Sequence, residues 1–361
     1  MDLKFEYTEN NHFKWGFGDE WYNRPDPEKQ YKIQLGYTTR PVMRFRDECI
    51  DVARKIAAKA TKPIIVGLSG GSDSQMVCLS FREAGVPFKV VIVKMYDNEE
   101  KLVNGHDIKT AYVFCEKYGI EWIDFEINID EYYATKGKEY AAKYGLTGVH
   151  TILQCATMDF VGQDYCYIMG GGDIVFAPYK TYVTPDVAEQ LPTIPNLDDM
   201  VRPVWWQTPL PIMQHMMAMG YEGTSKFYLY TPEIIAAYLT DPVVTDFLNA
   251  QDTVYEVFCR WHPHARMWWR CFHMLFKPLM TQREWPEMVP ARKYTGFEQL
   301  QGKNFNSGKE VLYQKYISDA ADGISDGQVI TTPITDLIEY VTTPHTHNLL
   351  ATRIVRGVTT G

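Results

Sequence analysis

Six consecutive residues combine glycine, hydroxyl and carboxylate groups in an order suited to binding phosphate: Ser69, Gly70, Gly71, Ser72, Asp73 and Ser74. The two glycines let the main chain turn sharply, so that its N–H groups point into one concavity. A helix that begins at the end of such a loop adds the positive end of its dipole, which favours a negative charge. The loop lacks the Gly-Lys-Ser/Thr of a Walker motif, so the lysine and hydroxyl of that motif are missing from their usual places. These residues, called loop 69–74 below, therefore predict a phosphate-binding loop of a different kind.

The segments on either side of loop 69–74 are typical of a strand and a helix. The run from Ile64 to Leu68 is short, apolar and preceded by Pro63, as in a strand buried on both faces of a parallel sheet. After the loop, apolar residues from Met76 onward recur at helical spacing until Gly85, where a turn is expected. The sequence thus predicts a strand, a phosphate-binding loop and a helix in direct succession.

In this context, loop 69–74 resembles the complete Ser-Gly-Gly-x-Asp-Ser signature of the PP-loop (N-type) ATP pyrophosphatases. This adenine nucleotide alpha-hydrolase-like superfamily includes asparagine synthetase and PAPS reductase. The resemblance implies that all six loop residues bind the β,γ-pyrophosphate of ATP, with Mg²⁺, while a substrate oxygen attacks the α-phosphorus. It also implies that adenine is read by main-chain groups at the end of the second strand, at about Val93 and Lys94.

The rest of the first half repeats the strand and helix alternation. Such an order predicts an α/β fold with a doubly wound, parallel, five-stranded sheet, and ligands then bind at the carboxyl ends of the strands. The expected helices span 44–60, 107–118, 130–144 and 149–160, and the further strands span 88–95, 121–127 and 165–169.

The fourth predicted strand ends in three glycines and an acid: Gly170, Gly171, Gly172 and Asp173. Parallel connectivity places them at the same edge as loop 69–74. Asp73 and Asp173 could then supply the carboxylates that Mg²⁺ needs, which would make both catalytic. The segment lacks the second acid seen in asparagine synthetase-like proteins, so a solvent-facing turn acid at 173 is the alternative.

Composition changes along the chain and predicts three regions. Residues 1–43 are aromatic and turn-rich, and they either pack across the domain surface or pair with a partner chain, which leaves a homo-oligomer open. Residues 44–184 form the ATP-binding domain. Residues 185–361 begin with a proline-rich stretch and form an aromatic-rich, mainly helical region for substrate or partner binding.

Basic residues in the last region are candidates for holding an anion, either the substrate or pyrophosphate. Arg266 and Arg270 are four residues apart on one helical face, and Lys293 belongs to a local basic cluster. A solvated loop is the alternative for that cluster. The Cys and His residues in 259–273 do not form two compact ligand pairs, so a helix in an aromatic core is favoured over a zinc site.

Overall composition sets the protein class. The chain has 361 residues, 45% of them hydrophobic, and a net charge of −9, which argues against nonspecific nucleic-acid binding. It has no apolar run of the ~18 residues that a membrane span needs and no signal-peptide core. Seven cysteines without a CxxC pair indicate buried, reduced thiols, so a cytoplasmic location is expected.

The reaction is narrowed by exclusion. A PAPS reductase-like activity needs a redox cysteine near the C-terminus, whereas the last cysteine is Cys271, and thiolation enzymes commonly show paired cysteines. The favoured function is an ATP-dependent ligase or amidating enzyme that forms AMP and pyrophosphate with an unidentified acceptor. Sulfur chemistry with an external thiol, and a non-catalytic nucleotide-binding or scaffold role, stay open as alternatives.

Overall fold

The computed structural model describes the central part of the chain and several shorter pieces. The described residues are 12–17, 19, 31–144, 149–170, 175–178, 201–205, 209–249, 280–281, 283–290, 328–331, 339, 341–343 and 354–356.

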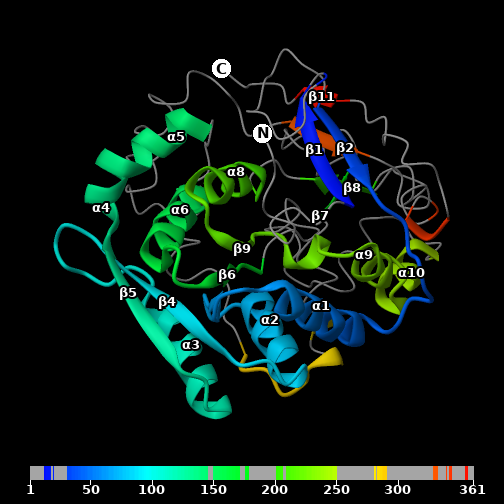
Figure 1. The fold of residues 1–361 in the computed structure, drawn as a ribbon, viewed down its shortest axis with the longest axis horizontal. Coiled ribbons are helices and arrows are strands. Elements are labelled where there is room, and N and C mark those ends of the chain that lie inside the picture. The colour runs from blue at the N-terminus through cyan, green and yellow to red at the C-terminus, as the bar shows by residue number, and fades with distance from the viewer. Residues whose placement is uncertain are drawn as a thin grey trace, which may run out of the picture.

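A five-stranded parallel sheet forms the centre of the molecule, in the order β5-β4-β3-β6-β9 (Figure 1). The chain starts at the central strand β3, adds β4 and β5 on one side, and then adds β6 and β9 on the other. A ligand crevice forms outside the carboxyl ends of the strands where the order reverses in this way. The predicted doubly wound sheet is confirmed, and loop 69–74 follows the strand at the reversal. The strands are β3 (Ile64–Gly67), β4 (Phe88–Tyr96), β5 (Trp122–Asn128), β6 (Cys166–Ile168) and β9 (Glu222–Thr224).

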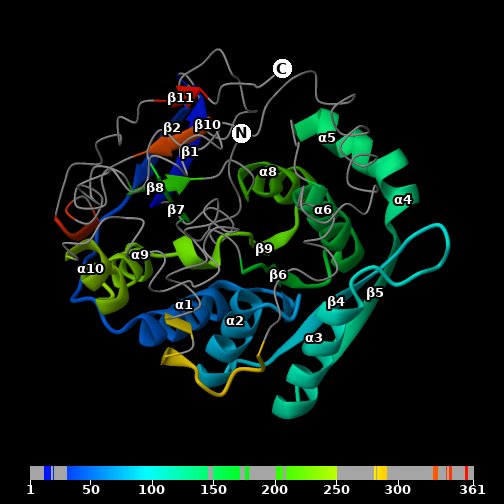
Figure 2. The ribbon, with the colours of Figure 1, turned by 180° about the vertical axis from the view of Figure 1, so that it is seen from behind.

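Helices cover both faces of this sheet because its strands are apolar on both faces (Figures 1 and 2). Ile64 and Val66 of β3 pack with residues of α1, α2 and α3, whereas Ile65 packs with residues of α5, α6 and α8. The helices are α1 (Phe45–Lys59), α2 (Ser72–Glu83), α3 (Gly105–Tyr118), α4 (Ile129–Tyr132), the π-helical η1 (Tyr133–Gly137), α5 (Lys138–Tyr144), α6 (Val149–Val161), α8 (Pro209–Met219), the 3-10 helix η4 (Phe227–Leu229), α9 (Pro232–Leu239) and α10 (Pro242–Asn249).

The other strands of the described residues form two antiparallel sheets, one of two strands and one of four. The N-terminal region contains an antiparallel pair, so it has more regular structure than its composition indicates. A four-stranded antiparallel sheet has the order β11-β10-β8-β7. The last strand of the parallel sheet, β9, comes from beyond residue 184, so the described region after 184 supplies both helices and part of the central sheet. These additional strands are β1 (Phe13–Phe17), β2 (Tyr31–Leu35), β7 (Val175–Pro178), β8 (Val201–Trp205), β10 (Gln328–Thr331) and β11 (Ile354–Arg356).

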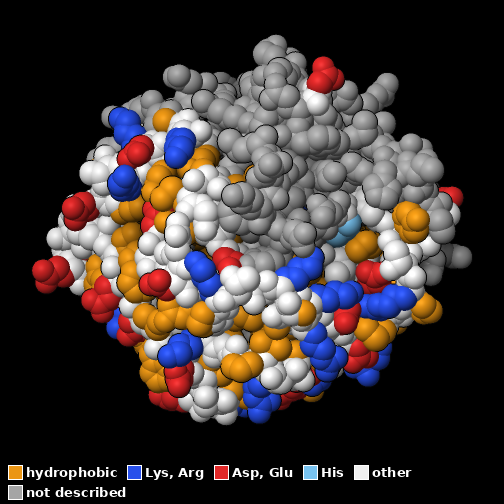
Figure 3. All heavy atoms as spheres, in the orientation of Figure 1, with side chains coloured by type: hydrophobic (Ala, Val, Ile, Leu, Met, Phe, Trp, Pro, Cys, Tyr) orange, Lys and Arg blue, Asp and Glu red, His pale blue; other side chains and the backbone are white. Residues whose placement is uncertain are grey.

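On the face drawn in Figure 3, Lys and Arg side chains lie among Asp and Glu side chains. Elsewhere in the described residues the charges also pair, and the Lys89 ammonium lies 2.8 Å from the Glu121 carboxylate. Every helix in the described ranges is too short or too polar to cross a lipid bilayer.

A polar cluster joins α5, α6 and α8 on one face of the sheet. The Asp159 carboxylate accepts hydrogen bonds from Tyr140 (2.5 Å) and Tyr221 (2.9 Å), and it lies 2.8 Å from His215 Nε2. The other ring nitrogen of His215 contacts the Tyr144 hydroxyl at 3.0 Å. Burial alone would raise the pKa of Asp159, but the hydrogen bonds from His215 and Tyr140 outweigh it, and the pKa is lowered.

Asp159→Asn is therefore expected to lower the free energy of unfolding at pH 7 by about 1–2 kcal/mol, since the charged acceptor is only partly screened by water. A carboxyl whose pKa is depressed by folding contributes stability above its unfolded pKa, and that contribution is lost as the pH falls through its folded pKa. Urea unfolding of both proteins should show a difference at pH 7 that shrinks near pH 3. The exposed Asp164 provides the control substitution Asp164→Asn. An equal difference at both pH values would contradict the expectation.

Candidate functional site

Loop 69–74 is closed by the hydroxyl of its last residue. Ser74 Oγ accepts a hydrogen bond from the Ser69 N–H (3.2 Å) and donates one to the Gly71 carbonyl (3.0 Å). Its oxygen also lies 3.2 Å from Ser69 Oγ. Ser74 is buried and Ser69 is exposed, so Ser74 fixes the turn while Ser69 faces outward. The two serines of the motif therefore have different structural roles.

Gly70 makes the close packing of the loop possible. It has φ of +80°, in the left-handed region that favours glycine. A Cβ at this position would lie 2.5 Å from the Asp107 carbonyl oxygen and 3.1 Å from the Ala111 nitrogen, both in α3. Loop 69–74 thus packs against the first turns of α3, and this position has no room for a side chain.

Helix α2 begins at Ser72 with Gly71 as its N-cap, so its first N–H groups have no partner within the helix. Asp73 lies in this first turn, half-buried, and its carboxylate accepts a 3.2 Å hydrogen bond from the Ser72 hydroxyl. The Tyr228 hydroxyl, from η4, donates to the Asp73 carbonyl at 2.6 Å. Helix N-terminal N–H groups and a carboxylate therefore lie together at the carboxyl edge of β3, where an anion with its metal can be held.

The predicted glycine of the fourth strand lies beside this turn. A Cβ on Gly170 would be 3.4 Å from both the Asp73 carbonyl oxygen and a methyl group of Val77. The end of β6 is thereby brought against loop 69–74, as parallel connectivity predicts. Gly171, Gly172 and Asp173 lie outside the described residues, and so do Arg266, Arg270, Lys293 and the segment 259–273.

The main chain at Val93 and Lys94 is already engaged. The Asn104 carboxamide donates to the Val93 carbonyl (2.8 Å) and accepts from the Met95 N–H (3.0 Å). Lys94 belongs to the ladder with β5, opposite Glu126, and its ammonium group lies 2.7 Å from Asp124. Adenine contact at these main-chain groups stays a prediction.

Comparison with known proteins identifies the domain that contains this loop. The profile of the NAD synthase family matches residues 45–150, from α1 through β3, loop 69–74 and α2 to the beginning of α6. A tRNA-specific 2-thiouridylase, MnmA from Shewanella amazonensis, is 33% identical over 70 residues. The chain carries a PP-loop domain of the adenine nucleotide alpha-hydrolase-like superfamily. The aligned residues cover 19% of this chain and 19% of that thiouridylase, so the likeness concerns only a part of each protein.

Two solved structures show a weak overall likeness to this chain. NMN synthetase from Francisella tularensis has 14% identity and a TM-score of 0.25, over 36% of this chain and 53% of that chain. An NH3-dependent NAD synthetase from Campylobacter jejuni, in complex with nitrate, has 12% identity and a TM-score of 0.30, over 84% of this chain and 97% of that chain. The assignment of the PP-loop domain rests on the loop sequence, its geometry and the profile match.

Lys226 is a candidate functional residue that the sequence patterns did not reveal. It follows the short strand β9, so it lies at the carboxyl edge of the sheet, and it is 1% exposed. A lysine is almost never fully buried unless it is paired. Burial lowers the pKa of His12 to about 3, and the positive charge of Lys226 acts in the same direction, whereas a hydrogen bond to the Leu229 carbonyl raises it. The backbone of Lys226 therefore lies at the carboxyl edge of the sheet, and its positive charge acts on His12.

Proposed function

We propose that this protein is an ATP-dependent enzyme that cleaves ATP between the α and β phosphates. An oxygen of the acceptor attacks the α-phosphorus, the bond to the bridging oxygen breaks, and pyrophosphate leaves with that electron pair. An amine or ammonia then displaces AMP from the activated acceptor. The observation that carries the proposal is the complete PP-loop signature in its strand, loop and helix geometry, within the segment that matches the NAD synthase profile.

The loop geometry supports binding of the leaving pyrophosphate. The main-chain N–H groups at the start of α2 can donate to phosphate oxygens, and the helix dipole favours their negative charge. These donors are fixed before ATP binds, because Ser74 closes the turn and Gly70 packs against α3. Donors held in place in this way stabilise charge that develops in the transition state without having to reorganise.

The donor set around Asp73 fits magnesium. Asp73 supplies a half-buried carboxylate next to the Ser72 hydroxyl, and these are hard oxygen donors. Within the described ranges, no group of three or more His, Cys, Asp or Glu side chains could hold a metal on its own. Mg²⁺ commonly binds through one or two carboxylates together with substrate phosphates, and when bound it neutralises phosphate charge. Asp73 would hold the ion, and Asp173 is proposed as its second carboxylate.

Lys226 is proposed to add positive charge at the same edge of the sheet. Its backbone N–H bonds to Thr224 Oγ1 at 3.2 Å, and its carbonyl accepts from the Leu229 N–H at 3.0 Å. The turn it begins also carries Tyr228, which bonds to the Asp73 carbonyl. The lysine is therefore part of a segment that is tied directly to the PP-loop.

The described cysteines favour ligation over sulfur transfer by this chain's own thiols. Cys49, Cys78, Cys115, Cys155 and Cys166 are all buried. Burial raises the pKa of the Cys115 thiol to about 12 and also raises the pKa of Cys78. Protonated, buried thiols are poor nucleophiles, so sulfur chemistry at these five positions would need an external donor.

Phosphorus NMR of the products tests the proposed cleavage. The protein is incubated with Mg·ATP and a panel of carboxylate acceptors, each with ammonia, an amine or a sulfur donor, and a reaction with excess chelator is the control. AMP and pyrophosphate are expected, in a reaction that depends on one acceptor. Formation of ADP and phosphate would refute the proposal, and ATP binding without any cleavage would favour a non-catalytic role.

A further inference from the structure

Gln75 connects the PP-loop to a distant part of the chain. This residue is completely buried in the first turn of α2, directly after loop 69–74. Its Nε2 donates to the Gly70 carbonyl at 2.8 Å and to the Val289 carbonyl at 2.9 Å, and its Oε1 accepts from the Val289 N–H at 3.0 Å. One carboxamide therefore holds the loop and the main chain of residue 289 at the same time.

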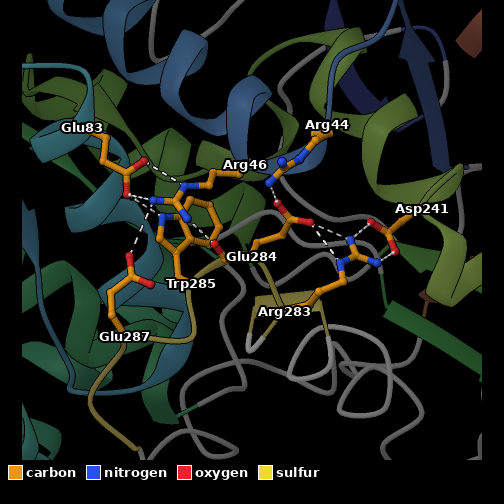
Figure 4. Close-up of polar contacts among 8 residues, drawn as sticks. All are labelled: Arg44, Arg46, Glu83, Asp241, Arg283, Glu284, Trp285 and Glu287. Carbon is orange, nitrogen blue, oxygen red and sulfur yellow. Dashed lines mark hydrogen bonds and ion pairs between the residues drawn. The ribbon is translucent and has the colours of Figure 1, made fainter.

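The segment that contains Val289, residues 283–290, is called the strap. Polar contacts with α1 and α2 hold its first half (Figure 4). Arg46 of α1 bonds to the Glu284 carbonyl (2.5 Å) and to both carboxylate oxygens of Glu83, and the Trp285 indole N–H bonds to Glu83 at 2.9 Å. Since Trp285 contacts the last turn of α2 and Val289 contacts its first turn, the strap follows α2 back toward the PP-loop.

Both ends of the strap are tied down. Arg283 forms a two-bond ion pair with Asp241, next to α10, at 3.0 and 2.5 Å. Near the other end, the Tyr118 hydroxyl of α3 donates to the Glu287 carbonyl at 2.8 Å. With contacts to α1, α2, α3 and the α9–α10 junction, the strap gives Gln75 a partner whose own position is held by several elements.

The hydrogen bond from Gln75 to the Gly70 carbonyl fixes the plane of the Gly70–Gly71 peptide in loop 69–74. In a planar trans peptide the carbonyl and the next N–H point in opposite directions. Because Gln75 holds the Gly70 carbonyl on the buried side, the Gly71 N–H is directed outward, where it lies 3.4 Å from the exposed Ser69 hydroxyl. Glycine would otherwise let this peptide rotate at little cost.

We propose that Gln75 is a positioning residue through which the strap sets the orientation of the Gly70–Gly71 peptide. That orientation in turn sets the affinity of loop 69–74 for phosphate. The inference rests on the proposed function, because it assumes that loop 69–74 binds the pyrophosphate part of ATP. It adds a residue outside the six-residue signature and a segment more than 200 positions away as determinants of that binding.

Calorimetry with magnesium pyrophosphate and with Mg·α,β-methylene-ATP tests the role of Gln75. Gln75→Met keeps the size of the side chain and removes all three hydrogen bonds, and it is expected to weaken binding of both probes about ten-fold. Hydrogen exchange of the peptide containing residues 69–74 should also become faster. Gln75→Glu keeps the bond from the Val289 N–H and removes the two donated bonds, so it tests the same contact if Gln75→Met does not fold.

Ser80→Ala is the matched control, because Ser80 is also buried in α2 and, among the residues that the structure describes, its hydroxyl bonds within the helix, to the Met76 carbonyl at 2.7 Å. This variant should bind both probes as the wild type does, with unchanged loop exchange. A Gln75→Met protein that folds and binds within two-fold of the wild type would overturn the role of Gln75 alone. A wild-type protein that binds neither probe would overturn the proposed function, and the role of Gln75 with it.

Discussion

Gly70→Val is expected to abolish detectable binding of Mg·ATP. The residue has φ of +80°, which costs a non-glycine residue about 1–2 kcal/mol. Its Cβ would also lie 2.5 Å from the Asp107 carbonyl oxygen, which belongs to the backbone of α3 and cannot move without shifting the helix. The loop must therefore separate from α3, and its N–H groups lose their common direction. A loss of at least ~100-fold in affinity, about 2.7 kcal/mol, should appear in calorimetry with a nonhydrolysable ATP analogue.

Gly85→Ala separates backbone strain from damage to the loop. Gly85 has φ of +69°, close to that of Gly70, but no atom lies within 4 Å of its added Cβ. This variant should lose about 1 kcal/mol of unfolding free energy and bind ATP normally. If Gly70→Val binds the analogue as tightly as Gly85→Ala does, the close packing of Gly70 on α3 has no part in nucleotide binding.

The strand, loop and helix around residue 69 could be predicted from the sequence because their signals are local. An apolar run from Ile64, two glycines and helical spacing after Met76 each depend on neighbouring residues. The same local signals predicted β4, β5 and β6. The alternation of these strands with helices predicted that they pair in parallel. β9 has only three residues and no such signal, so its place in the central sheet could not be foreseen.

Contacts between distant segments account for what the sequence did not reveal. Asn104 covers the Val93 carbonyl because the chain after β4 folds back along that strand, and no pattern in 97–104 predicts this return. Lys226 reads as an ordinary polar residue until β9 is placed beside β6. Gln75 reads as a helix residue until Val289 lies against it. Each of these roles is set by tertiary packing, which local propensity does not report.

Asp73 gives the sharper test of the two carboxylates predicted to bind magnesium, because its main chain is held in place at the carboxyl edge of the sheet. Its position in the first turn of α2, with its carbonyl held by Tyr228 and its backbone packed against Gly170, leaves little freedom for its main chain. The carboxylate is half-buried and close to the N–H groups that are proposed to bind pyrophosphate. A substitution that keeps its shape therefore changes charge at a fixed place.

Asp73→Asn is expected to keep the fold and to lower magnesium-dependent turnover by at least ~100-fold, because hard-cation binding needs the carboxylate charge. Asp173→Asn should have a similar effect, and the double variant should lose little more than either single one, since residues that act as one unit are lost together. Asp47→Asn is the matched control, because Asp47 lies exposed in the first turn of α1 and interacts with a helix dipole in the same way. Turnover measured against Mg²⁺ concentration decides the question. Unchanged magnesium dependence in Asp73→Asn, or single effects that multiply in the double variant, would show that the two carboxylates do not share one ion.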